Sequence, residues 1–326
     1  MMKLPSRRFL QLAASTAFLP AVSRSASAQN YPARPVRLTV GSPPGGQIDI
    51  IARLTGQWLS ERLGQPFIVE NRPGAGSNIG AEAVVRAPAD GHMLFLASAT
   101  NAINATLYDN LSFNFVRDTT PVASINRIPI VLKVHASFSA RTVAELVDHA
   151  KSNPGKFNLG TPSKGTGPYM AAELFKMMTG ADMVLVPYRG DAQMLTDLLG
   201  GRVQAAIGGV SASIEHIKAG KLRALAVTTA ARLEELPDIP TVAASVPGYE
   251  ATGWCGVVAP KNTSAEIVEK LHKEIGAGLA DPKFRAQLAI LGVTPFALSP
   301  IDFGKFIADE TEKWGKVIRF AGLKTE

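Results

Sequence analysis

Residues 35–63 read PVRLTVGSPPGGQIDIIARLTGQWLSERL, and this stretch predicts the fold class. Pro35–Val40 is a short apolar run of the kind that forms a buried strand, and Gly41–Gly46 supplies a turn. From residue 48 to residue 63 apolar side chains recur at the spacing of a helix, and Gly64 ends the pattern. A strand that passes through a glycine-rich turn into a helix is the repeating unit of α/β proteins.

The same alternation continues along the chain. Further apolar runs predict strands at residues 67–69, 92–97, 130–134, 157–160, 183–186, 203–207 and 222–227. Helical spacing predicts helices at residues 79–85, 142–152, 168–178, 192–199, 214–219, 265–279, 283–291 and 302–320. Alternating strands and helices predict parallel sheets with helices on both faces. No serine- or glycine-rich linker divides the chain, so we expect two domains joined by crossing strands.

The length, charge and cysteine content of the chain limit its possible functions. A chain of 326 residues corresponds to about two domains, and 46% hydrophobic residues can form a real core. The net charge is +7, but residues 1–28 contain four basic residues and no acidic one. Without them 30 basic and 27 acidic residues remain, a net charge of +3, so composition does not predict nucleic-acid binding. The single cysteine, Cys255, excludes an internal disulfide and a multi-cysteine metal site.

Residues 1–28 have the pattern of a secretory signal peptide. Met1–Arg8 is basic, Phe9–Val22 is mostly apolar, and Ala26-Ser27-Ala28 is a small-residue cleavage site. A membrane anchor is the alternative, but the apolar run of 14 residues is shorter than the roughly 20 that a span needs. Arg7-Arg8 leaves both the twin-arginine and the general export route open. We expect a periplasmic mature protein that begins near Gln29.

Catalytic and nucleotide motifs are absent from the sequence. The five histidines form no H-E-x-x-H pattern and no pair at metal-ligand spacing. Gly209–Ser213 lacks the final glycine of a nucleophile elbow, so Ser211 is interpreted as a helix cap. Gly74–Gly80 resembles a dinucleotide fingerprint but is one residue too long. We therefore predict a protein that is not an enzyme and has no cofactor and no metal.

Four neutral turns rich in hydrogen-bond donors follow predicted strands. They are Gly41–Asp49, Ser98–Asn101, Gly160–Gly167 and Val186–Asp191. Ligands of open α/β sheets bind outside the carboxyl ends of the strands. The N-terminus of a helix there offers free backbone N–H groups and a partial positive charge, and glycine lets an anion approach. Together these turns predict a site that holds a carboxylate without a catalytic group.

The chain resembles a known family over essentially its whole mature length. The resemblance rests on Pro43-Pro44-Gly45-Gly46 with Asp49-Ile50-Ile51-Ala52-Arg53, on Val69-Glu70-Asn71-Arg72-Pro73-Gly74-Ala75-Gly76, on Val186-Pro187-Tyr188-Arg189-Gly190 and on Pro237-Asp238-Ile239-Pro240-Thr241-Val242. These runs are similar to those of the extracytoplasmic solute receptors of tripartite tricarboxylate transporters, the TctC-like or Bug (Bordetella uptake gene) receptors.

The resemblance implies a periplasmic binding protein fold of type II, with two α/β lobes and a ligand cleft between them. Lobe 1 would comprise residues 29–130 and 229–326, and lobe 2 residues 131–228. It also implies a monomer that takes up a small organic carboxylate and delivers it to a membrane permease. Two alternatives stay open: a receptor that presents its ligand to a sensor system, and a secreted hydrolase. The ligand and the permease cannot be named from the sequence.

The resemblance and the four turns together give a set of candidate ligand-binding residues. They are Ser42, Pro44, Gly45, Gly46, Asp49, Ser98, Thr100, Asn101, Thr161, Ser163, Gly165, Thr166, Arg189 and Gly208. Asp49 is expected to cap its helix, because a second negative charge would repel an anion. Arg189 is either a partner for a second carboxylate or a solvated loop residue.

Three positions depart from the pattern of the family. Gly208-Gly209 stands where relatives often carry Asp-Asn, Gly41-Ser42 replaces the commoner Pro-Phe, and Cys255 replaces an aromatic residue. Each change leaves a smaller side chain or none, so we expect a more open pocket, and Gly208 leaves the far end of the ligand without a polar partner.

Overall fold

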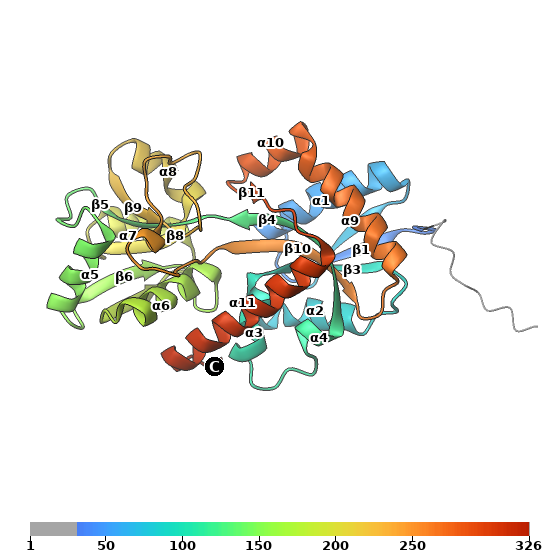
Figure 1. Ribbon diagram of the computed structural model, residues 1–326, viewed down its shortest axis with the longest axis horizontal. Helices are drawn as coiled ribbons and strands as arrows, with labels where there is room; N and C mark the ends of the chain where they lie inside the picture. Colours follow the sequence, from blue (N-terminus) through green and yellow to red (C-terminus); the bar gives the residue numbers. More distant parts are fainter. Residues whose placement is uncertain (1–30, 326) are drawn as a thin grey trace, which may run out of the picture. The chain divides into compact units, whose positions relative to one another are not determined.

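The computed structural model describes residues 31–325, and the residues from Pro32 onward form one compact unit. The predicted signal peptide lies outside the described residues. Two β-sheets with helices packed around them make up the unit (Figure 1). The predicted α/β class is therefore confirmed.

The first sheet has the strand order β11-β4-β10-β3-β1-β2. Its strands are β1 Val36–Val40, β2 Phe67–Asn71, β3 Met93–Ser98, β4 Thr119–Ile128, β10 Gly253–Pro260 and β11 Thr294–Pro295. β1 pairs in parallel with β2 and β3, whereas β10 runs antiparallel to β3 and β4. The carboxyl ends of β1, β2 and β3 therefore share one edge.

The second sheet has the order β7-β6-β8-β5-β9. Its strands are β5 Ile130–His135, β6 Phe157–Thr161, β7 Met183–Pro187, β8 Ala205–Gly209 and β9 Leu222–Val227. β6 is parallel to β7 and β8, while β5 is antiparallel to β8 and β9. The prediction of purely parallel sheets is wrong. Only Pro129 separates β4 from β5, and β5 enters the second sheet where β8 ends, with Ile130 opposite Gly209, so it must run backwards.

Eleven α-helices of the described chain cover the two sheets. Their bounds are α1 Gln47–Leu63, α2 Asn78–Val85, α3 Ala99–Leu107, α4 Phe115–Asp118, α5 Val143–Ser152, α6 Gly167–Thr179, α7 Asp191–Leu199, α8 Val210–Lys218, α9 Ala265–Ala280, α10 Pro282–Ile290 and α11 Pro300–Ala321. α1, α9 and α10 lie on one face of the first sheet and α2, α3 and α11 on the other (Figure 1). On the second sheet α7 and α8 lie opposite α6.

Sequence and structure differ at a few elements. α3, α4, β4 and β11 were not predicted, and Ser98–Asn101, interpreted as a turn, is the start of α3. β8 is Ala205–Gly209 instead of residues 203–207, and α8 begins at Val210 instead of residue 214. Gly208 and Gly209 suggest a turn in the sequence, but both pair with β5 in the structure. Cross-strand pairing therefore decides the end of this strand, against local preference.

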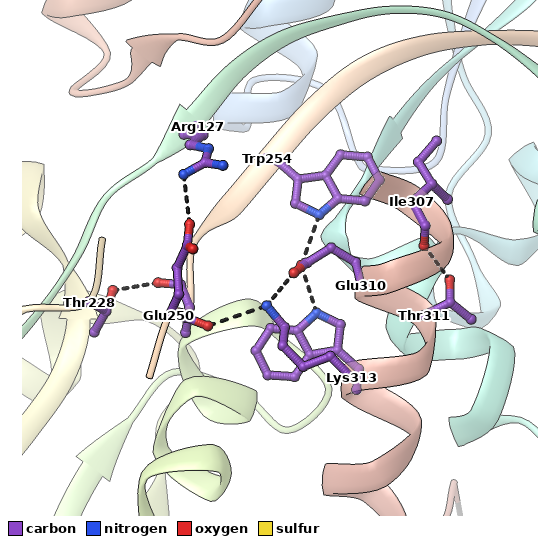
Figure 2. Close-up of polar contacts among 10 residues, drawn as sticks. Arg127, Thr228, Glu250, Trp254, Ile307, Glu310, Thr311 and Lys313 are labelled. Carbon is purple, nitrogen blue, oxygen red and sulfur yellow. Dashed lines mark hydrogen bonds and ion pairs between the residues drawn. The ribbon is translucent and has the colours of Figure 1, made fainter. Parts of the chain in front are cut away.

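A polar network fastens α11 to the segments where the chain passes between the sheets (Figure 2). The Glu310 carboxylate is buried and accepts hydrogen bonds from the indole N–H groups of Trp254 (3.3 Å) and Trp314 (3.0 Å) and from Lys313. Lys313 also donates to the carbonyl of Glu250 (3.3 Å), whose side chain pairs with Arg127 (2.7 Å). α11 is thereby linked to β4, to β10 and to the connection before β10.

A second set of bonds joins the crossing segments directly. Thr228, just after β9, donates to the carbonyl of Ile130 through its backbone N–H (3.0 Å) and its hydroxyl (3.1 Å). The hydroxyl also lies 2.5 Å from the carbonyl of Ala251. The two segments in which the chain crosses between the sheets, at β4–β5 and at β9–β10, are thus joined through Thr228.

We predict that Gly256→Ala, in the centre of β10, destabilises the fold. A Cβ atom there would collide with the ring of Phe303 and lie 2.7 Å from the carbonyl of Ala123. Overpacking of this kind costs about 1–3 kcal/mol in the free energy of unfolding. Gly276→Ala in α9 is the control, because a Cβ there meets nothing within 4 Å. Equal free energies of unfolding for the two variants, measured with denaturant, would contradict the prediction.

Candidate functional site

The predicted donor-rich turns lie at the carboxyl edges of the two sheets. β1, β2 and β3 are followed by α1, α2 and α3, and β6, β7 and β8 are followed by α6, α7 and α8. Because the strands within each set are parallel, the N-termini of their helices gather at one edge of each sheet. This is where open α/β sheets bind ligands.

Five of the six helices that start at these edges differ from the other helices in how they begin, and the exception is α3, where Ser98 and Asn101 form a capping box. Within the described chain, the N-cap residues of α1, α2, α6, α7 and α8 provide no side-chain cap. By contrast α4, α5, α9, α10 and α11 are capped by Asn114, Thr142, Ser264, Asp281 and Ser299. Backbone N–H groups at the carboxyl edges are therefore left for other partners.

Asp49 fastens the Gly41–Asp49 turn. Its carboxylate is 2% exposed and accepts from the backbone N–H of Gly45 (2.9 Å), from Arg53 (3.0 and 3.1 Å) and from Asn71 (2.8 Å). Burial alone raises the pKa of Asp49, but these hydrogen bonds and the Arg53 charge outweigh it and hold the pKa below its usual value. Asp49 is thus a structural anchor, and it takes up the N–H of Gly45, itself a candidate ligand donor.

Pro44, Gly45 and Gly46 form the exposed tip of this turn. Gly45 has φ 82°, in the left-handed region that favours glycine, and a Cβ there would meet nothing within 4 Å. A larger residue at Gly45 would therefore strain the backbone rather than clash.

Three polar side chains near this turn lack a hydrogen-bond partner among the described residues. They are Ser42 (Oγ), Asn78 (Nδ2) and Asn101 (Nδ2), and each of these atoms is out of contact with solvent. The other halves of the two amides are fixed: Asn78 Oδ1 accepts from Asn104 (3.0 Å), and Asn101 Oδ1 accepts from the N–H of Ser98 (3.0 Å). These bonds hold both amides with an N–H₂ group free to donate.

The loops that carry these side chains touch one another. Asn104 of α3 also donates to the carbonyl of Gly76 (2.6 Å), just before Asn78. A Cβ at Gly41 would collide with Ser77, so Gly41 allows the first two turns to meet. Ser98 and Thr100, the other candidates of this group, are half-buried at the start of α3. The first sheet thus collects a cluster of uncharged donors.

The candidate hydroxyls of the second sheet all donate to backbone carbonyls of the two turns on that sheet. Thr161 donates to the carbonyl of Pro162 (3.0 Å), Ser163 to that of Tyr188 (3.0 Å) and Thr166 to that of Ser163 (2.7 Å). Gly165 has φ 75° and packs against the first sheet's α3: a Cβ there would lie 3.3 Å from Leu107 Cδ2. Arg189 is exposed.

The expectation that Gly208 and Cys255 open the pocket is wrong. A Cβ at Gly208 would collide with the carboxylate of Asp191 and the methyl group of Met194, and would lie 3.2 Å from Lys133 Nζ. Other side chains therefore fill this space. Cys255 is completely buried in β10, between Ser98 and Asn126 on the neighbouring strands.

Contacts from α10 and α8 bring the two edges together. The Gln47 amide at the start of α1 donates to the carbonyl of Leu291 (2.8 Å), and a Cβ on the next residue, Gly292, would collide with Ser211 at the start of α8. At α6, a Cβ on Gly167 would lie 3.9 Å from the Cα of Gly253 in β10. The N-termini of α6 and α8 thus lie against elements of the first sheet.

Sequence reasoning missed four residues of this region. Asn78 lies inside a quoted motif but was not selected, and Asn126, whose amide is buried with neither atom partnered among the described residues, lies in the unpredicted strand β4. Lys133 and Asp191 were not selected either. Lysine in the apolar run 130–134 was the available signal, because a charge in a buried strand is rare.

The described residues hold no group of three or more His, Cys, Asp or Glu side chains that could bind a metal. No helix in the range 31–325 is long and apolar enough to span a bilayer. Hollows of about 220, 300 and 300 Å³ lie beside α1 and α10, beside α5 and α6, and around residues 105–117. None of the three is lined by a candidate residue.

Comparison with known proteins places these features in a family. The model of the tripartite tricarboxylate transporter family receptor matches residues 51–323. Protein BugT of Bordetella pertussis is 35% identical over 306 residues, which cover 93% of this chain and 94% of BugT.

Two solved structures add ligands to the comparison. Rpa4515 of R. palustris with adipate is 38% identical, with a TM-score of 0.75 over 90% of this chain and 100% of that one. MatC (Rpa3494) of Rhodopseudomonas palustris with bound malate is 27% identical, with a TM-score of 0.71 over 88% of this chain and 100% of that one. The periplasmic binding protein fold is therefore confirmed. So is the expectation of a non-enzyme, because this family and these neighbours are solute receptors.

We predict that Asp49→Ala loosens the Gly41–Asp49 turn and lowers the melting temperature at pH 7 by a few degrees. Lost hydrogen bonds to a charged group cost about 2 kcal/mol. Because the pKa of Asp49 is lowered in the fold, its stabilisation is complete above the unfolded value of about 3.9 and is lost as the pH falls below it.

Thermal unfolding between pH 7 and pH 3 measures this difference. The exposed Asp148→Ala is the control. If the difference in melting temperature between Asp49→Ala and the parent chain stayed constant down to pH 3, this would be evidence against the anchor role of Asp49.

We also predict that Cys255 does not react in the folded protein. Burial raises the pKa of its thiol to about 12, so the thiolate that attacks alkylating reagents is scarce at pH 8. Iodoacetamide at pH 8 should label the chain in denaturant and leave the native protein unlabelled by mass spectrometry. Rapid labelling of the native protein would show that Cys255 is accessible.

Proposed function

This chain belongs to the tripartite tricarboxylate transporter family of receptors, and from that membership we propose that it is a periplasmic receptor for a small organic carboxylate. The receptor would deliver this carboxylate to a membrane permease. The observation that carries the proposal is the contrast in helix capping. Of the six helices that begin at the carboxyl edges of the sheets, five have an N-cap residue that provides no side-chain cap within the described chain, whereas the helices that begin elsewhere are capped. The exceptions at these edges are α3, which has a Ser98–Asn101 capping box, and α8, where Asp191 accepts a hydrogen bond from the N–H of Gly209. Free N–H groups at a helix N-terminus favour an anion.

The cluster of uncharged donors supports a carboxylate in particular. Ser42, Asn78 and Asn101 each bring a buried donor to the turns of the first sheet without a described acceptor. A buried donor left unpaired costs about 1–3 kcal/mol, and a carboxylate offers two oxygens that accept several hydrogen bonds. A neutral cluster of this kind fixes the carboxylate by geometry rather than by a paired cation.

The ligands of similar proteins agree with this chemistry. Adipate and malate, held by Rpa4515 and MatC, are both small carboxylates. We place the ligand of this chain between lobe 1, residues 29–130 and 229–326, and lobe 2, residues 131–228. The candidate residues Ser42, Gly46, Ser98, Thr100 and Asn101 would bind from lobe 1, and the α6 turn with Thr161, Ser163, Gly165 and Thr166 from lobe 2. Residues 1–28 would export the chain to the periplasm.

Transport rather than catalysis follows from the nature of the site. The donors are neutral amides, hydroxyls and backbone N–H groups, which bind an anion without taking or giving a proton. Closure of the lobes on the ligand would then present one conformation to the permease.

We predict that the mature chain, stripped of ligand by unfolding, dialysis and refolding, binds a small carboxylate, and that Asn78→Ala and Asn101→Ala each weaken binding about tenfold or more. Loss of one hydrogen bond to a charged group, about 1.5 kcal/mol, corresponds to that factor. Thermal unfolding against a panel of mono-, hydroxy-, amino- and dicarboxylates selects the ligand, and calorimetry gives its affinity.

Asn110→Ala is the control, since Asn110 is exposed beyond α3. No shift with any carboxylate, or unchanged affinity in both asparagine variants, would refute the proposed site. Uptake of the identified carboxylate should be lost in cells that lack the chain.

A further inference from the structure

The carboxyl end of β8 is occupied by a side chain from the neighbouring helix. Asp191, the first residue of α7, accepts a hydrogen bond from the backbone N–H of Gly209 (3.0 Å). Gly209 is the N-cap residue of α8. The carboxylate of Asp191 also takes the position that a Cβ of Gly208 would need, so this arrangement requires glycine at 208.

The carboxylate of Asp191 thereby occupies the N-terminus of α8, where an external anion would otherwise bind. An external carboxylate at the N-terminus of α8 would meet a like charge, which opposes binding. The other oxygen of Asp191 has no partner among the described residues, and the residue is partly exposed. This edge of the second sheet therefore presents a hydrogen-bond acceptor.

Lys133 stands behind Asp191. It is 0% exposed in β5, on the face that α7 covers, and its Nζ has no hydrogen-bond partner among residues 31–325. Burial lowers the pKa of Lys133 to about 8, and the negative charge of Asp191 opposes that shift. The ammonium is thus mostly charged at neutral pH, and Asp191 is its counter-charge.

The geometry settles which of the two groups a ligand would touch. Lys133 Nζ would lie 3.2 Å from a Cβ at Gly208, in a space that Asp191 and Met194 close off. A ligand at the edge of the sheet would reach the carboxylate of Asp191 first. The positive charge of Lys133 attracts that carboxylate from the inner side and holds it in place.

The N-terminus of α8 also faces the first sheet. Ser211 packs against Gly292, and the carbonyl of Leu291 accepts from Gln47 at the start of α1. The acceptor at Asp191 and the donors at α1, α2 and α3 thus belong to elements that are in contact through this loop.

We propose that the second-sheet half of the site recognises a hydrogen-bond donor, so that the ligand carries a carboxylate at one end and an amino or hydroxyl group at the other, instead of a second carboxylate. This inference rests on the proposed function and specifies its ligand class. Adipate and malate each carry two carboxylates, so the preference would set this chain apart from Rpa4515 and MatC.

The test compares ligands that differ only at the far end. One series is succinate, 3-aminopropanoate and 3-hydroxypropanoate, and the other is adipate, 6-aminohexanoate and 6-hydroxyhexanoate. Calorimetry on the refolded mature chain should show, in at least one series, an amino or hydroxy acid that binds about tenfold tighter than the dicarboxylate. Asp191→Asn should remove most of that preference by weakening the amino or hydroxy acid and strengthening the dicarboxylate.

Two matched variants distinguish the effect of Asp191 from that of charge elsewhere on the surface. Asp148→Asn removes the same charge from the exposed surface of α5 and should leave the preference unchanged. Arg189→Gln removes the exposed cation near α7 and tests the alternative in which Arg189 pairs with a second carboxylate. Circular dichroism and the melting temperature establish that each variant is folded.

The contrary outcomes are distinct. Tighter binding of the dicarboxylate in both series, weakened by Arg189→Gln, would overturn this inference and leave the proposed function standing. An amino or hydroxy acid preference that survives in Asp191→Asn would overturn the assignment to Asp191. No binding of any member, alone or in the wider carboxylate panel, would refute the proposed function and this inference with it.

Discussion

The direction of the strands is the constraint on which the site depends. A strand followed by a short turn delivers the N-terminus of its helix to its own carboxyl end, and β1–β3 and β6–β8 do this in parallel within each sheet. The antiparallel strands β5 and β10 carry the chain between the sheets. Because they run against their neighbours, the helices that follow them, α5 and α9, start at the opposite edges, where Thr142 and Ser264 cap them.

Much of this architecture follows from local pattern. The apolar run and glycine turn of residues 35–46 predict β1 and the start of α1, and the helical spacing of residues 142–152 predicts α5 within a residue. The predictions that were wrong concern features that depend on partners distant in sequence. Gly208 and Gly209 extend β8 because β5 pairs with them, and the mixed order of both sheets follows from where the chain crosses. No window of sequence contains that information.

The candidate site was predicted in the same uneven way. Three of the four turns were located correctly because glycine, proline and strand ends mark them, whereas Ser98–Asn101 is the start of α3. The roles of individual residues depend on tertiary contacts. Asp49 was expected to cap its own helix, but α1 has no side-chain cap, and Asp49 instead binds the Gly45 N–H before the helix, Arg53 and Asn71. The amide N–H₂ of Asn78 is free to donate because Asn104 holds the amide oxygen. Lys133 affects the site only through its charge interaction with Asp191.

The tight packing around Gly208 bears on how such a receptor changes its ligand in evolution. Any side chain at 208 collides with Asp191 and Met194, while loss of Asp191 leaves the buried ammonium of Lys133 without its counter-charge. Positions 133, 191 and 208 are therefore epistatic: each substitution is tolerated only in certain backgrounds, and their order along a lineage is restricted. A lineage that acquired a side chain at 208 would first need a smaller residue at 191, and either an acidic residue at 208 or an uncharged one at 133 would then have to compensate for the lost charge of Asp191.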